Sequence, residues 1–108
     1  MIKALFTRQT NGQLVGAKLT GHAGSGDYGF DIVCAAVSTL AINFINSLEV
    51  IAHCQATVTL NDVEGGYMDI SVPCHDNQET IQILFESFLL GMTKLAEDSS
   101  EFVQTKVI

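Results

Sequence analysis

The sequence predicts an α+β domain in which a mainly antiparallel sheet and two packed helices form two layers, in the order ββαββαβ. Three observations lead to this fold class. The dipeptide Asn11-Gly12, which is typical of tight hairpins, separates two short strand-like runs. Two longer segments carry apolar residues at three- and four-residue spacing, as one face of a helix requires. A ββα order occurs twice, and hairpins with helices on one face give a two-layer domain.

The first half of the chain is predicted to hold one hairpin and one long helix. Strands are expected at 2–8 and 13–20, and the four glycines of 21–29 predict a loop. The helix is expected to run from about Asp31, a good N-cap, to His53. Its apolar stripe comprises Val33, Val37, Leu40, Phe44, Leu48 and Ile51. Polar residues interrupt this stretch, so we expect a buried helix and not a membrane span.

The second half is predicted to repeat this arrangement and to add a strand. Strands are expected at 56–60, 67–72 and 101–108, with a turn at 61–66. Asp76 with Glu79 resembles a capping box and predicts the start of a helix that ends at about Asp98. The apolar side of this helix comprises Ile81, Leu84, Phe85, Phe88, Met92 and Leu95.

Composition restricts the partners and the compartment. The 108 residues are expected to form a single domain, 1–108. Twelve acidic against five basic residues give a net charge of −7, so direct nucleic-acid binding is not expected. The acidity favours a cationic partner or serves only solubility. The N-terminus lacks the apolar stretch of a signal peptide, which predicts a cytoplasmic protein without a membrane partner. The second predicted helix also carries apolar residues outside its main apolar stripe, and this excess apolar surface favours a homodimer.

The three cysteines, Cys34, Cys54 and Cys74, are an odd number, so they cannot all pair within one chain. In a reducing cytoplasm we expect free thiols. His53-Cys54 and Cys74-His75 combine residue types that bind zinc. Adjacent residues point in different directions, however, and the usual ligand spacing is missing. We therefore expect no metal and no cofactor, and we interpret Cys54 and Cys74 as ordinary thiols near element ends.

Cys34 and His22 are the candidates for chemistry. If Asp31 is the N-cap, Cys34 stands in the first helical turn, where unpaired amides and the helix dipole favour a thiolate and an oxyanion. The loop after His22 can bring the imidazole to the sulfur, where it would act as a general base. The alternatives are a packing role for Cys34, a surface role for His22, and for Asp31 either capping or orienting His22.

The motif residues resemble a known family. The stretches Gly21-His22-Ala23, Tyr28-Gly29 and Asp31-Ile32-Val33-Cys34-Ala35-Ala36-Val37-Ser38 are similar to the signature of the ribosomal-processing cysteine protease family (Prp). The element order over essentially the whole chain is similar too. The resemblance implies a small homodimeric cysteine endopeptidase. It places His22 and Cys34 at the positions of the catalytic dyad, and Gly21, Asp31 and Ser38 at the other motif positions.

The resemblance also implies a substrate. Members remove the N-terminal extension of the large-subunit ribosomal protein L-twenty-seven after an apolar, aromatic-containing segment, and an acidic surface suits a basic ribosomal protein. Ser38 lies one helical turn after Cys34 on the same face, where it either forms a hydrogen bond near the site or satisfies a backbone carbonyl. The alternative function is a non-catalytic acidic module that binds a basic ribosomal protein and tolerates loss of the Cys34 thiol.

Overall fold

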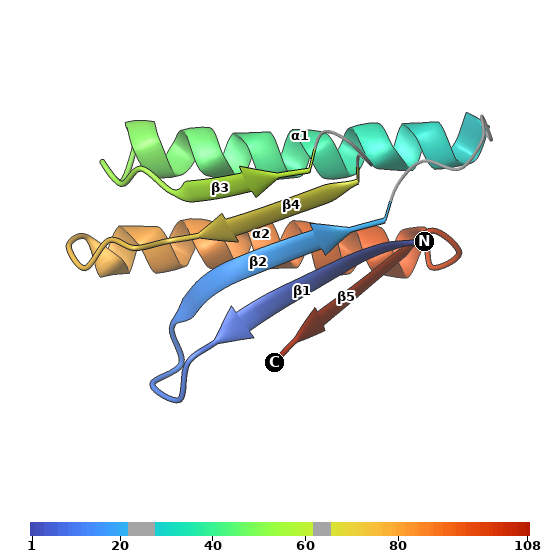
Figure 1. Ribbon diagram of the computed structural model, residues 1–108. Helices are drawn as coiled ribbons and strands as arrows, with labels where there is room; N and C mark the ends of the chain where they lie inside the picture. Colours follow the sequence, from blue (N-terminus) through green and yellow to red (C-terminus); the bar gives the residue numbers. More distant parts are fainter. Residues whose placement is uncertain (22–27, 62–65) are drawn as a thin grey trace.

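The computed structural model describes residues 1–21, 28–61 and 66–108. It confirms the predicted α+β fold with its ββαββαβ order (Figure 1). The seven elements are β1 (Ile2–Arg8), β2 (Leu14–Thr20), α1 (Tyr28–Val50), β3 (Thr57–Leu60), β4 (Tyr67–Ser71), α2 (Gln78–Asp98) and β5 (Val103–Val107).

The five strands form one sheet in the order β3-β4-β2-β1-β5. Neighbouring strands are antiparallel except β1 and β5, which are parallel. Both helices cover the same face of this sheet (Figure 1). The short edge strand β3 pairs only with β4, and this matters for the site because the β3–β4 hairpin lies beside α1.

The core lies between the sheet and the helices. Strand residues alternate between this layer and the opposite face, so Ile2, Ala4 and Phe6 of β1 are buried. Four phenylalanines meet at its centre, where Phe44 stacks on Phe88 with ring centroids 4.7 Å apart and Phe6 meets Phe88 edge-on at 5.2 Å. The predicted stripes supply most of the helical contribution, as Val33, Val37, Phe44 and Leu48 of α1 and Ile81, Phe85, Phe88 and Met92 of α2 are buried.

The predicted boundaries of the first helix were wrong at both ends. The helix begins at Tyr28, so Asp31 is its fourth residue and not its N-cap. Tyr28 and Gly29 were assigned to the loop because of glycine's low helix propensity, which is a weak constraint on a long packed helix. The helix ends at Val50, since His53 adopts a left-handed conformation with φ 53 and the Cys54 N–H donates to the Leu48 carbonyl oxygen at 2.9 Å.

The predicted capping box of the second helix was also wrong. Asn77 is the N-cap, because its carbonyl oxygen accepts the first helical hydrogen bond from the Ile81 N–H at 2.9 Å. Asn77 is left-handed at φ 60, a conformation that asparagine tolerates better than most residues. Its side-chain amide donates to the Ala52 carbonyl oxygen at 2.9 Å. This contact joins the start of α2 to the end of α1.

The expectation of a buried first helix was half right. By length and composition, Ile32–Val50 could cross a membrane, yet its core-facing stripe packs against the sheet and α2. Only 28% of the stretch is buried, and Ile32, Ile42 and Val50 are more than half exposed. The helix is therefore the core helix of a two-layer domain with an apolar outer side.

Candidate active site

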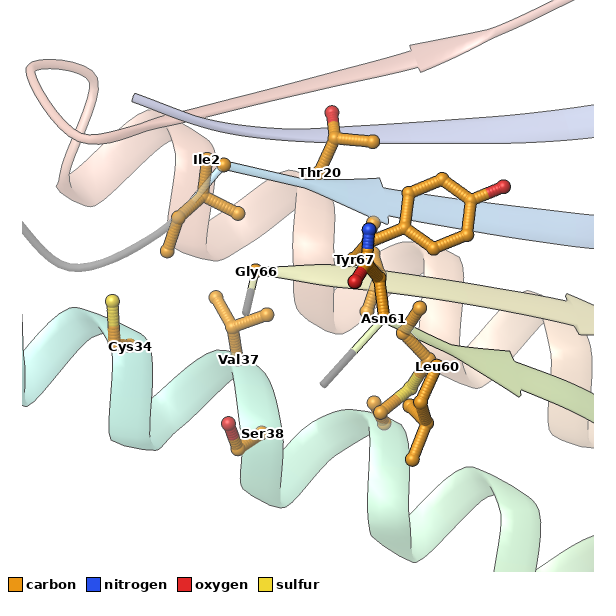
Figure 2. Close-up of a pocket in the computed structure, with 13 residues that line it drawn as sticks. Ile2, Thr20, Cys34, Val37, Ser38, Leu60, Asn61, Gly66 and Tyr67 are labelled. Carbon is orange, nitrogen blue, oxygen red and sulfur yellow. The ribbon is translucent and has the colours of Figure 1, made fainter. Parts of the chain in front are cut away.

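A pocket of about 400 Å³ lies between α1, the end of β2, the end of β3 and the start of β4 (Figure 2). Residues from β1, the end of β2, α1 and the β3–β4 hairpin build it, and Cys34 is among those from α1. Its lining is mostly apolar and consists of Ile2, Leu19, Thr20, Gly21, Cys34, Val37, Ser38, Ala41, Leu60, Asn61, Gly66, Tyr67 and Met68.

Cys34 is partly exposed and is the cysteine that takes no part in the disulfide. Figure 2 shows its sulfur pointing from α1 towards the side of the sheet where Ile2 lies. A thiol held on a rigid helix at the edge of a pocket can meet a carbonyl carbon that enters there. Cys34 is, however, the seventh residue of α1. The prediction that the helix start stabilises a Cys34 thiolate and an oxyanion is therefore wrong, since the unpaired amides and the dipole effect are confined to the first turn.

Ser38 lies in the same pocket, one turn along α1 from Cys34. This placement confirms that the two side chains share a helix face, as the four-residue spacing predicted. Thr39, the next residue, donates its hydroxyl to the Ala35 carbonyl oxygen at 2.9 Å. The hydrogen-bonding role proposed for Ser38 itself stays a prediction.

Gly21 forms the end of the pocket beside the N-terminus of the chain. Its φ of 98 lies in the region that favours glycine, and a Cβ there would overlap the Met1 carbonyl oxygen and lie 3.0 Å from the Ile2 Cα. The fold therefore requires a glycine at this motif position, because only a residue without a Cβ lets the end of β2 approach Met1 and Ile2 so closely.

The structure brings three of the five predicted site residues, Gly21, Cys34 and Ser38, into one pocket. His22 follows Gly21 in the chain and lies outside the described residues. The backbone of Asp31 belongs to α1, which removes the capping interpretation of this residue, while its side chain lies outside the described part of the structure.

Sequence reasoning missed the apolar wall opposite α1. Leu60 and Met68 face each other in the β3–β4 register and both line the pocket. Leu60 is 54% exposed, so its apolar side chain is accessible to a ligand in the pocket. The signal available in the sequence was only an apolar residue at the end of a predicted strand, which is too common to indicate a binding wall.

The expectation of three free thiols was wrong, because Cys54 and Cys74 form a disulfide with their Cα atoms 6.0 Å apart. The fold brings the end of α1 next to the segment before α2, and no local pattern in the sequence reveals that proximity. The two sulfurs are bonded to each other in this structure, so they are not available together as thiolate ligands for zinc.

Comparison with known proteins agrees with this arrangement. A family model described as Cysteine protease Prp matches residues 1–104. The Ribosomal processing cysteine protease Prp of Staphylococcus aureus is 26% identical over 104 residues, which are 96% of each chain. The protein of the same name from Bacillus subtilis is 25% identical over 101 residues, 91% of this chain and 89% of that one.

Solved structures share the fold over the whole chain. The crystal structure of SMU.848 from Streptococcus mutans has a TM-score of 0.91 and 54% identity, covering 100% of this chain and 94% of that chain. Prp from S. aureus in complex with a substrate peptide has a TM-score of 0.87 over all of both chains. Because the two sequences are only 23% identical, this likeness shows a shared fold and nothing more. Because the family model spans nearly the whole chain, this protein belongs to the cysteine protease Prp family, as do the ribosomal processing cysteine proteases of S. aureus and B. subtilis that it resembles.

Proposed function

We propose that the protein is the endopeptidase that removes the N-terminal extension of ribosomal protein L-twenty-seven during ribosome maturation, with Cys34 as nucleophile and His22 as its general base. The observation that carries this proposal is the position of Cys34 at the edge of an apolar pocket large enough for peptide side chains. The Prp structure from S. aureus with a covalently linked product peptide supports a covalent route.

The proposed mechanism has two stages. His22 takes the proton of Cys34, and the sulfur attacks the scissile carbonyl to give a tetrahedral intermediate. As this intermediate collapses, the C–N bond breaks, the protonated imidazole gives its proton to the leaving amine, and the acyl-enzyme thioester remains. Water then hydrolyses the thioester, with His22 again acting as base. Gly21, Asp31 and Ser38 are proposed to support the dyad. Gly21 allows the close approach of the chain to Met1 just before His22, and Ser38 lines the pocket in which the peptide would bind.

Two features of the chain favour a ribosomal protein precursor. The pocket presents Leu60, Met68, Leu19 and Val37 to a ligand, which suits an apolar or aromatic side chain in the leader. The net charge of −7 attracts the basic body of a ribosomal protein and repels RNA. A cytoplasmic location follows as part of the proposal, because ribosomes mature there.

The test is mass spectrometry of a peptide that carries the ribosomal leader, after incubation with wild-type protein or with Cys34→Ala. A single cut by the wild type, absent with the variant, would support the proposal and locate the scissile bond. Binding without any cut would overturn it and leave the acidic binding module.

The apolar wall gives a prediction about substrate affinity. Leu60→Asp places a carboxylate where a leader side chain would pack, and we expect KM to rise about tenfold or more, because losing one leucine contact costs at least about 1.5 kcal/mol. Folding should be little affected, since Leu60 is 54% exposed. Thr57→Asp is the matched control, on the same strand but on the other face. Equal KM values for the two variants would place the peptide elsewhere.

A homodimer is proposed through the outer side of the two helices. Ile32, Ile42 and Val50 of α1 and Ile83 and Leu90 of α2 are each more than half exposed, and covering them removes apolar surface from water. We expect light scattering to give the mass of two chains for the wild type and of one chain for Ile42→Lys. A one-chain mass for the wild type would contradict this interface.

A further inference from the structure

The Cys54–Cys74 disulfide closes the base of the β3–β4 hairpin. Cys54 lies three residues before β3 and Cys74 three residues after β4. The last hairpin pair on that side is Thr57 with Ser71. A Cα–Cα distance of 6.0 Å is within the normal range for a disulfide. The bond therefore joins the two chain segments that lead into and out of the hairpin.

The other end of the same hairpin forms a wall of the pocket. Leu60, Asn61, Gly66, Tyr67 and Met68 all line it. Strand β3 is the least supported part of this wall, because it has four residues, lies at the sheet edge and pairs only with β4. Holding the segment before β3 in place consequently limits how far the edge strand can move from the pocket.

The two sulfurs differ in their access to solvent. Cys54 is 2% exposed, and its backbone N–H is held by the Leu48 carbonyl oxygen at 2.9 Å. Cys74 is partly exposed. An incoming thiolate therefore reaches the sulfur of Cys74 first, with the Cys54 thiolate as leaving group. Cys34 is roughly 24 Å from the end of α1 along the helix axis, given its rise of about 1.5 Å per residue, so it is not the attacking thiol.

We propose that Cys54 and Cys74 form a reversible oxidation site, in which the disulfide fixes β3 and stiffens that wall of the pocket. In reduction, a low-molecular-weight dithiol attacks Cys74, and the Cys54 thiolate leaves and takes up a proton. The second thiol of the reductant then closes its own disulfide and releases Cys74. In oxidation, the two thiols and hydrogen peroxide give the disulfide and two water molecules.

The experiment uses the full chain with Cys34→Ala, so that Cys54 and Cys74 are the only thiols. Peroxide-treated and dithiothreitol-treated samples are alkylated and weighed to count free thiols, and their Tm and the hydrogen exchange of the β3 amides are measured. We expect no free thiol after peroxide, a Tm higher by about 10 °C from closing a loop of this length, and slower exchange in Thr57–Leu60.

The matched control adds Cys74→Ser to Cys34→Ala. Position 74 is partly exposed, so this variant should fold and should lose the response to the redox treatment. Two alkylatable thiols after peroxide would overturn the proposal. So would equal Tm and equal β3 exchange for the oxidised and reduced forms.

A fourth readout, peptide affinity, rests on the proposed function. We expect the oxidised form to bind the leader peptide a few-fold more tightly than the reduced form, because its wall is already ordered. Equal affinities would overturn the link between the disulfide and the pocket. Absence of binding by both forms would overturn the proposed function, whereas the Tm and exchange measurements decide the oxidation site by themselves.

Discussion

Cys34→Ala is expected to lower kcat for leader cleavage by about 10⁴-fold or more while peptide binding persists. Without the sulfur no acyl-enzyme forms, and losses of this order follow removal of a catalytic nucleophile. Peptide affinity should change little, because the apolar lining from Leu60, Met68 and Val37 is untouched. Single-turnover cleavage and a separate binding titration measure the two quantities.

A matched variant distinguishes catalysis from a general effect of losing a cysteine. Cys74→Ser removes a cysteine that does not line the pocket, and its kcat should stay within a few-fold of the wild type. If Cys34→Ala retained comparable cleavage, the nucleophile would have to be another group, and the acidic binding module would regain support.

Gly21→Ala is expected to lower kcat/KM by about 100-fold or more and to destabilise the fold by several kcal/mol. The left-handed conformation alone costs an L-residue about 1–2 kcal/mol. In addition, the new Cβ would overlap the Met1 carbonyl oxygen and crowd the Ile2 Cα at 3.0 Å. These are backbone atoms, so the strand ends must separate. Because Ile2 and Gly21 both line the pocket, that separation changes the shape of the pocket.

Gly12→Ala is the control for the conformational part of this effect. Gly12 also has a positive φ, of 90, but no atom lies within 4 Å of its added Cβ among the described residues. Urea denaturation should show a loss of about 1–2 kcal/mol for Gly12→Ala, with cleavage unchanged. If the two alanine variants behaved alike in stability and cleavage, the close approach of Gly21 to the N-terminus would have no role in the site.

The fold could be predicted because its information is local. The hairpin at Asn11-Gly12 and the helical stripes through Val37 and Phe85 depend on turn chemistry and on periodic burial, which neighbouring residues encode. Helix ends were less predictable. Asn77, and not Asp76, caps α2. The left-handed backbone of Asn77 and its contact with Ala52 depend on how the two helices meet, so the local sequence did not predict this cap.

In the candidate site, too, the features that depend on local spacing were predicted and those that depend on packing were not. Cys34 and Ser38 were predicted to share a helix face from their spacing, and the structure confirms it. The chemical advantage predicted from a helix start at Asp31 was wrong, since three further residues precede it in α1. The apolar wall that Leu60 and Met68 form was not predicted, because it depends on which strand lies beside α1.

By itself the sequence determined the element order, the class of fold, the candidate nucleophile and the family signature around it. Each of these depends on residue types or on spacing within a few turns or strands. Only the tertiary structure decided which distant segments build the pocket, and which cysteines pair. Leu60 lines the same pocket as Cys34, and Cys54 reaches Cys74, because the sheet has the order β3-β4-β2-β1-β5 with α1 against its β3 edge. Such long-range contacts form through the packing of whole elements, which no short pattern in one chain encodes.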